Sequence, residues 1–256
     1  MVPPNGNFWF TVPLGRGVTL LTQNDDGLAA FNKPAGVLSH PNDRGDERRS
    51  LINAPYVIEG EFYEWRVSND AAAGKQRLWL LNRLDSATSG VILVAASEAL
   101  ATQIRAHFKQ KQVHKVYQAL VFGAPREAVE VWKDRLAIEK RGGQIRTATR
   151  AGHVPAESRM TLVKPGSSDP RVSLIRLEPK TGRSHQLRVQ CAKRHLPIVG
   201  DQTYGDFARN RAFAKAAGTK RLFLHSMAAR FAYEFRGRHQ EFSATAPLPE
   251  EFEKFL

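Results

Sequence analysis

The sequence has a single cysteine, Cys191, among its 256 residues. One thiol excludes an internal disulfide and any cysteine-cluster metal site. The longest strongly apolar run, residues 90–96, is far shorter than the ~20 residues that a membrane span needs. The first ten residues lack the basic start and apolar stretch of a secretory signal. These absences favour a soluble protein of the cytoplasm.

Several catalytic and cofactor-binding motifs are also missing. His185, His195 and Asp201 do not have the spacing of two histidines on one helical face, so no metal site is predicted. Residues 200–205 lack the Gly-Lys-Ser/Thr ending of a phosphate loop. There is no serine-centred nucleophile elbow, and Cys191 falls on an apolar helix face as a core thiol. We therefore expect no metal site.

Acidic residues are scarce in the second part of the chain. The whole sequence has 38 Lys and Arg against 25 Asp and Glu, a net charge of +13. Residues 1–100 hold 9 basic and 11 acidic residues, so residues 101–256 carry 29 against 14, a net charge of +15. Such a basic segment predicts a polyanionic partner, in most cases nucleic acid. Anionic lipid, heparin or a basic surface without a ligand are the alternatives.

Apolar and turn patterns predict an α+β protein with a largely antiparallel sheet. Leu100, Ile104 and Phe108 recur at helical spacing after Ser97, a candidate N-cap. Strands are predicted at 27–31, 78–84, 91–95, 116–122, 160–163, 172–177 and 221–235, and further helices at 184–194, 207–217 and 249–255. Residues 160–177 form a predicted hairpin. We expect one domain over 1–256, with 1–26 as an N-terminal extension and 41–77 as a long, little-structured loop or insertion.

Three segments are candidates for chemistry. In residues 82–90 (NRLDSATSG), Asp85 follows an apolar strand and precedes small hydroxylated residues, which suits a rigidly held carboxylate, although the spacing alone favours an Asx-turn. In residues 179–188, a glycine turn delivers Arg183 and His185 to a helix N-terminus, either an anion site or a plain solvated turn. Lys115 and Tyr117 share a strand face, suited to an anionic aromatic ligand or to packing.

Together these segments resemble the RluA family of RNA pseudouridine synthases. The resemblance lies in the Arg-Leu-Asp of residues 83–85, the Asn-Lys-Pro-x-Gly of 32–36, and the Lys-x-Tyr of 115–117. Thr-Gly-Arg-x-His-Gln-Leu-Arg at 181–188 and Pro-Ile-x-Gly-Asp-x-x-Tyr-Gly at 197–205 complete the set, in the family's order. One residue departs: the family usually has His before Arg-Leu-Asp, where this sequence has Asn82.

The resemblance implies a pseudouridine synthase fold, with a central mixed, mainly antiparallel sheet, flanking helices and a catalytic cleft. It implies that Asp85 is the covalent catalyst, that Tyr117 stacks on the flipped uracil, and that Arg183 pairs with the aspartate. A guanidinium would keep such a carboxylate ionised. The residues expected to contact substrate are Arg83, Leu187, Lys33, Lys115, His185, Gln186 and Arg188. No cofactor is implied.

The partner implied is RNA, either tRNA or rRNA. Only about 26 residues precede the first predicted strand, so we expect no N-terminal RNA-binding module. The Gly-Asp…Arg-Asn-Arg pattern in residues 205–211 favours a tRNA substrate over rRNA. We expect a monomer without an obligate protein partner or a membrane association. A non-catalytic RNA-binding protein of the same fold, and an unrelated enzyme acting on a polyanion, are the competing hypotheses.

Overall fold

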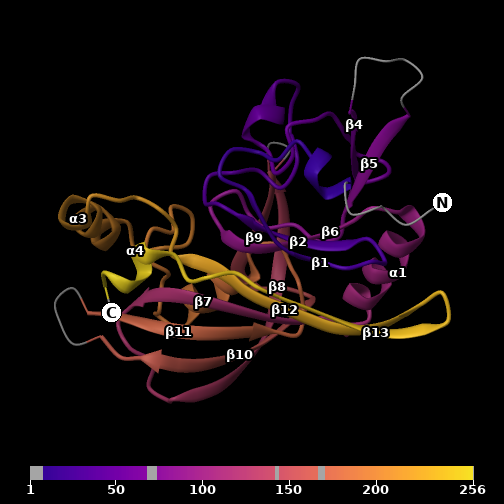
Figure 1. Cartoon of the computed structure of the whole chain (residues 1–256). Coiled ribbons are helices and arrows are strands. Elements are labelled where there is room, and N and C mark those ends of the chain that lie inside the picture. The colour runs from indigo at the N-terminus through magenta and orange to yellow at the C-terminus, as the bar shows by residue number, and fades with distance from the viewer. Residues whose placement is uncertain (1–7, 68–73, 142–143, 167–170, 256) are drawn as a thin grey trace. The chain divides into compact units, whose positions relative to one another are not determined.

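The computed structural model describes residues 8–67, 74–141, 144–166 and 171–255 (Figure 1). The chain divides into two compact units. Unit 1 comprises Met1–Val113 and Ala228–Ala246, and unit 2 comprises His114–Met227 and Pro247–Leu256. Each unit contains an antiparallel sheet, and each is described by itself below. Whether they form one catalytic domain stays a prediction.

Unit 1 is built on β6 (Ser89–Ala95), which is buried along its whole length. It pairs with β2 (Leu28–Lys33) from Leu28↔Ala95 to Lys33↔Gly90, and its last two residues pair with β5 (Lys75–Leu80). β1 (Thr19–Gln23) continues the sheet beyond β2. β4 (Phe62–Arg66) joins β5 to β3 (Tyr56–Val57). β12 (Leu224–Phe235) enters this unit at Ala228, where it pairs with β13 (Arg238–Thr245).

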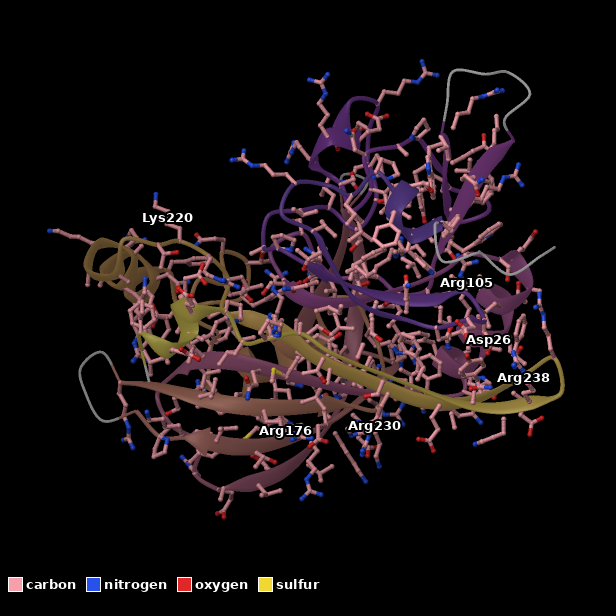
Figure 2. All side chains as sticks on the ribbon, viewed as in Figure 1. Asp26, Arg105, Arg176, Lys220, Arg230 and Arg238 are labelled. Carbon is pink, nitrogen blue, oxygen red and sulfur yellow. The ribbon has the colours of Figure 1, made fainter. Side chains whose placement is uncertain are left out.

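Helix α1 (Glu98–Lys109) packs on this sheet through Leu100 and Ile104, in one core with residues of β2, β6 and β12. Arg105 on the same helix donates to the carbonyl oxygens of Leu80 and Glu61, and so ties the helix to the β4–β5 region. In the same unit, the guanidinium of Arg238 lies 2.7 Å from Asp26 (Figure 2). Two 3₁₀ turns, Phe8–Thr11 and Asp46–Arg49, complete the unit.

Unit 2 is an antiparallel sheet in the order β7-β11-β10-β8-β9. Its strands are β7 (His114–Phe122), β8 (Val129–Arg141), β9 (Gln144–Ala151), β10 (Val154–Lys164) and β11 (Val172–Pro179). Its helices are α2 (Gln186–Lys193), α3 (Phe207–Ala217) and the short α4 (Glu250–Glu253). Phe213 and Phe252 bring α3 and α4 into one core with β7 and β11.

The predicted α+β class, the antiparallel pairing and most elements are confirmed. The β10–β11 hairpin pairs as expected, with its loop residues 167–170 outside the described chain. Helix α3 has the predicted bounds, and α1 buries Leu100 and Ile104 as its spacing predicted. Cys191 is buried in α2, as expected of a core thiol. Among the described residues, no helix is long and apolar enough to cross a membrane.

Other predictions were wrong. Residues 41–77 are not a little-structured connection, because they contain a 3₁₀ turn, β3, β4 and the start of β5. The strand predicted at 78–84 ends at Leu80, since the chain leaves the sheet there to form the loop around Asp85. Helix α2 begins at Gln186 and not at Ser184, because His185 adopts a left-handed backbone conformation with φ 54°. The strands β1, β8, β9 and β13 were not predicted.

Candidate active site

Asp85 lies in unit 1, half-buried in the loop that joins β5 to β6. This loop is held from one side by Lys33 at the end of β2, whose side chain is fully buried. The Lys33 ammonium donates to the carbonyl oxygens of Ser86 at 3.1 Å, Val37 at 2.7 Å and Pro34 at 3.0 Å. Three carbonyl oxygens match the three donors of an ammonium. The Asn-Lys-Pro-x-Gly segment is thereby fastened to the residue that follows Asp85.

The backbone of the same segment adds a second tie. The N–H of Gly36 donates to the carbonyl oxygen of Ser86 at 2.8 Å. Gly36 has φ 89°, a conformation that favours glycine, so the motif's glycine is needed for this approach. Within the loop, the N–H of Thr88 donates to the carbonyl oxygen of Asp85 at 2.9 Å and closes a tight turn. This bond defines a backbone turn at Asp85, and the Asx-turn and catalytic-loop interpretations of this segment both stay predictions.

The other flank of Asp85 is fixed by Ser39. Its hydroxyl donates to the carbonyl oxygen of Leu84 at 2.8 Å and accepts the N–H of Leu84 at 3.0 Å. Tyr63, fully buried on β4, donates its own hydroxyl to the carbonyl oxygen of Ser39 at 2.6 Å. Asn82 accepts the N–H of Leu93 at 2.8 Å, so the residue that departs from the family pattern has a defined bond to β6. Ser39 and Tyr63 were not predicted as site residues.

Lys33 also has an electrostatic consequence. Burial lowers the pKa of Lys33 to about 7, against the opposing effect of the nearby Asp85 charge. The side chain thus changes charge within the neutral pH range. When protonated, Lys33 places a cation beside the loop that carries Asp85.

Arg83 lies exposed on the far side of the same loop. Its Nη1 is 3.3 Å from Nε2 of His40, whose ring stacks on Tyr56 at 4.8 Å between centroids. The pair of rings and the guanidinium offer aromatic and cationic surface next to Asp85. Such a combination suits contact with a nucleotide, and substrate contact by Arg83 stays a prediction.

In unit 2, the structure brings two of the predicted segments together. Lys115 and Tyr117 share one face of β7, and Tyr117 lies opposite Leu177 of β11. The Lys115 ammonium donates to the carbonyl oxygen of Thr181 at 3.3 Å, in the glycine turn after β11. Burial lowers the pKa of Lys115 to about 8. The Lys-x-Tyr strand and the turn that carries Arg183 are thus neighbours.

Arg183 is exposed at the tip of this turn and is held at two points. Its backbone N–H donates to Oε1 of Gln186 at 3.1 Å, and its Nε donates to the carbonyl oxygen of Pro155 on β10 at 3.3 Å. Within the described part of unit 2, the guanidinium forms no ion pair with a carboxylate. Its two terminal nitrogens are therefore available on this unit for an anionic partner.

Behind the turn lies a buried ion pair between Arg188 of α2 and Asp201. Arg188 donates from Nε at 2.8 Å and from Nη2 at 2.7 Å to the two carboxylate oxygens. Burial pushes the pKa of Asp201 upward, but the bonds and charge of Arg188 outweigh it and hold that pKa below its ordinary value. The Arg188 guanidinium also lies over the ring of Tyr204, whose hydroxyl is 2.9 Å from Nδ1 of His185. The Arg188–Asp201 ion pair thus links α2 to residues 200–205.

Leu187 and the pattern of residues 205–211 also make contacts within unit 2. Leu187 is buried at the start of α2. In the 205–211 pattern, Asp206 caps α3, Asn210 is buried and bonds the backbone of Gly200 and Asp201, and Arg209 lies over the ring of Phe122. These contacts give most of that pattern a role in folding unit 2.

Residues 27–193 match the family model described as RNA pseudouridylate synthase, which is well over half of the chain. The chain belongs to the RNA pseudouridylate synthase family. The RluA-type resemblance is confirmed, and the protein is an RNA pseudouridine synthase that isomerises uridine in RNA. The competing hypothesis of an unrelated enzyme acting on a polyanion is wrong.

Curated relatives agree with this assignment. A tRNA pseudouridine synthase C of Vibrio cholerae is 31% identical over 223 residues, covering 84% of this chain and 86% of the relative. One of Yersinia pestis is 31% identical over 212 residues, covering 79% of this chain and 76% of the relative. A ribosomal large subunit pseudouridine synthase C of Vibrio vulnificus is 30% identical over 237 residues, covering 93% of this chain and 68% of the relative.

Solved structures share the synthase fold. Human RNA pseudouridylate synthase domain containing 1 has a TM-score of 0.64 at 22% identity and covers 90% of this chain and 83% of that one. Human RNA pseudouridylate synthase domain containing 4 also has a TM-score of 0.64, at 23% identity, covering 91% and 90%. The predicted pseudouridine synthase fold is confirmed.

The predicted site residues of the synthase fall into two groups. Asp85, Arg83 and Lys33 belong to unit 1, whereas Tyr117, Arg183 and the remaining predicted residues belong to unit 2. Within each unit the predicted residues are brought together. The pairing of Asp85 with Arg183, and the stacking role of Tyr117, stay predictions. The supports Ser39 and Tyr63 carried no signal of a site role in the sequence, whereas Asp201 lies in the motif of residues 197–205.

Proposed function

We propose that this synthase acts through Asp85 as the covalent catalyst and that its substrate is tRNA. The observation that carries the role of Asp85 is the fixation of its loop on both flanks, by Ser39 at Leu84 and by Lys33 and Gly36 at Ser86. A nucleophile must be held in one geometry to react efficiently.

The reaction is an isomerisation, so it consumes no second reactant. The carboxylate of Asp85 attacks either the sugar or the base of the uridine. The bond between N1 and C1′ breaks, the uracil turns, and a bond between C5 and C1′ forms. The proton on C5 leaves and N1 takes one up, so the product has the composition of the substrate. The carboxylate is released unchanged.

The other predicted residues supply access and charge. A base stacked in RNA must be flipped out before a carboxylate can reach it. Stacking of the flipped uracil on Tyr117, at ~1–3 kcal/mol, offsets part of the unstacking cost. The terminal nitrogens of Arg183 bind the Asp85 carboxylate through two parallel hydrogen bonds and keep it ionised.

The substrate class is supported by the names of relatives. Several relatives at 31–33% identity are named tRNA pseudouridine synthase C, among them proteins of Vibrio cholerae and Vibrio parahaemolyticus. The second candidate is large-subunit rRNA, which is favoured by the Vibrio vulnificus relative that aligns with 93% of this chain. Both candidates are polyanions that fit the net charge of +15 in residues 101–256.

The test is chemical mapping of pseudouridine in total RNA from cells with and without the gene. Purified wild type and the Asp85→Asn and Asp85→Ala variants are then given unmodified tRNA and rRNA. We expect one or a few tRNA uridines to lose the modification in the deletion strain, and only wild type to restore them. Both variants should keep their affinity for RNA, because the carboxylate does not bind the phosphates.

Three outcomes would correct the proposal. Restoration of an rRNA site alone would replace tRNA by rRNA. Pseudouridine formation by a pure Asp85→Ala protein would remove Asp85 from the mechanism. RNA binding without isomerisation of any substrate would revive the non-catalytic hypothesis, with Asn82→His as the first substitution to make.

A further inference from the structure

Several buried groups fasten the turn that carries Arg183 to the body of unit 2, and the side chain of Gln186 bonds the backbone N–H of Arg183 itself. This glutamine is 3% exposed. Its Oε1 accepts the backbone N–H of Arg183 at 3.1 Å and the hydroxyl of Thr181 at 2.7 Å. Its Nε2 lies 3.2 Å from the carbonyl oxygen of Glu157 and 3.0 Å from the hydroxyl of Ser158.

The orientation of this amide is fixed by the backbone. The N–H of Arg183 can only donate, so the side chain must present its oxygen there. The carbonyl of Glu157 can only accept, so the side chain must present its nitrogen on the opposite side. Gln186 is therefore a two-ended link between the turn and β10, and neither a carboxylate nor an apolar chain can replace it.

The link continues into the sheet. The hydroxyl of Ser158 donates to Oε1 of Gln190 at 2.8 Å, and Nε2 of Gln190 donates to Asp134 at 2.9 Å. The hydroxyl of Thr181 also accepts the N–H of Glu157 at 2.9 Å. A chain of hydrogen-bonded groups thus runs from the Asp134 carboxylate of β8 through β10 to the turn. Buried networks of this kind rigidify what they hold, provided every member is satisfied.

We propose that Gln186 is a positioning residue for the isomerisation, and that it acts by fixing the backbone of Arg183. This inference rests on the proposed role of Arg183 as the partner of the catalytic carboxylate. The second hold on Arg183, from its Nε to Pro155, comes from the same strand, β10. The backbone of Arg183 is bonded to β10 through Gln186, and its Nε is bonded to β10 directly. These two bonds fix the positions of the two terminal nitrogens.

The substrate-contact role that the sequence predicts for Gln186 and the positioning role proposed here have different effects on the kinetics. A residue that binds RNA equally in the ground and transition states changes affinity, whereas a residue that positions Arg183 changes turnover. Because both ends of the amide are occupied within the protein, we expect the second behaviour.

The experiment is a double-mutant cycle between Gln186 and Arg183. Gln186→Met keeps the shape of the side chain and removes all of its hydrogen bonds, and Gln186→Glu keeps only the acceptor end. For both, we expect the single-turnover rate to fall by about 10- to 100-fold, the range expected when a catalytic group is misplaced by around an ångström. The Kd for RNA should stay within about threefold of wild type.

The cycle supplies the decisive result. If Gln186 acts through Arg183, Gln186→Met should slow the Arg183→Met protein by less than about twofold. Equal slowing in both backgrounds would overturn the proposal, and so would a Gln186→Met enzyme with wild-type turnover. If Arg183→Met itself has the wild-type rate while Gln186→Met is slow, the role of Arg183 fails and the positioning proposal fails with it.

Ser173→Ala is the matched control for lost stability. Ser173 is fully buried in unit 2 and also makes two hydrogen bonds to the backbone, donating to Gly123 and accepting from Gly166. It lies six residues before the end of β11, ~20 Å along the strand from the turn. It should lower the melting temperature by a similar amount and leave the turnover unchanged. The assay uses whichever RNA the mapping identifies, so a wrong tRNA assignment does not affect this test.

Discussion

In unit 1 the loop that carries Asp85 is held by a buried ammonium, whereas in unit 2 the turn that carries Arg183 is held by a buried amide. Lys33 bonds three carbonyl oxygens, and Gln186 bonds two donors on one side and acceptors on the other. Both side chains are almost fully buried, and both lie in motifs of the family. The difference lies in charge.

A charged and a neutral holder have different consequences. The Lys33 ammonium adds a positive potential beside a carboxylate that has to be ionised, and it can lose its proton near pH 7. The Gln186 amide bonds the backbone N–H of Arg183 and carries no charge, while the Lys115 ammonium bonds the same turn at Thr181. Lys33 and Gln186 therefore differ in their response to pH, because an ammonium titrates and an amide does not.

Replacing Lys33 by Met should have the largest effect. The variant leaves the carbonyl oxygens of Pro34 and Val37 without this donor, whereas that of Ser86 keeps the Gly36 N–H, and it removes the cation near Asp85. With ~1–3 kcal/mol for each of the two unsatisfied groups, we expect about 2–6 kcal/mol of lost stability. Turnover should fall by at least about 100-fold, since a loosened catalytic loop misplaces the carboxylate. Chemical denaturation and single-turnover assays measure both.

Lys75→Met is the control for this substitution. Lys75 lies in the same unit, is exposed and pairs with Glu64. We expect less than about 1 kcal/mol of lost stability, as for other surface ion pairs, and unchanged turnover. A Lys33→Met protein with normal turnover would show that the two holders are not equivalent and that unit 1 does not depend on Lys33.

Asp201→Asn should have the next largest effect, in unit 2. The variant leaves the buried Arg188 guanidinium without its carboxylate, and breaking such a pair costs about 3–5 kcal/mol. Asp46→Asn, in the largely exposed pair with Arg49, should cost less than about 1 kcal/mol. Thermal denaturation of the two variants checks this. Equal losses would mean that burial of the Arg188–Asp201 pair is irrelevant to unit 2.

The extent to which the sequence predicts the structure differs between the secondary-structure elements and the side-chain contacts of the site. The spacing of apolar residues sufficed for α1, α3 and the β10–β11 hairpin, because one face of each is buried. β8 was missed although Trp132 and Leu136 are buried and Lys133 and Arg135 exposed. That period-two pattern lies within a charged stretch, which concealed it.

The candidate site was predicted as a set of motifs and not as a structure. Lys33 and Gln186 were expected to contact RNA because polar residues in a motif suggest a ligand. Only the fold shows that both side chains are buried and bonded to the protein. Ser39 and Tyr63 carried no signal at all, since their partners are backbone groups distant in sequence. The polar composition of residues 41–77 predicts a loop, although β4 within them supplies Tyr63.

The pH dependence of stability should distinguish the two holders directly. An unfolded lysine keeps its proton up to about pH 10.5, whereas folded Lys33 has a pKa of about 7. Between these values the unfolded state binds more protons, so the free energy of unfolding rises with pH by up to ~1.4 kcal/mol per unit. From pH 7.5 to 9 we expect wild type to gain about 2 kcal/mol over Lys33→Met.

Two features make this comparison specific. Lys115, with its pKa lowered to about 8, adds a slope of the same sign, but it is present in both proteins and cancels. A Gln186→Met protein should keep the wild-type slope, because an amide does not titrate. Parallel slopes for wild type and Lys33→Met would show that Lys33 stays protonated throughout this range.

The smallest predicted effects concern the N-caps of one helix in each unit. Asp206 accepts the N–H groups of Ala208 and Arg209 at the start of α3, at 3.0 Å each, so Asp206→Ala should cost about 1 kcal/mol. Ser97 occupies the N-cap of α1 with an extended backbone, but its side chain makes no cap hydrogen bond. Ser97→Ala should therefore be close to neutral, although both residue types favour N-caps. Urea denaturation of the two variants resolves such a difference. Equal destabilisation would mean that Ser97 does cap α1 in solution, and the contrast between the two helices would then disappear.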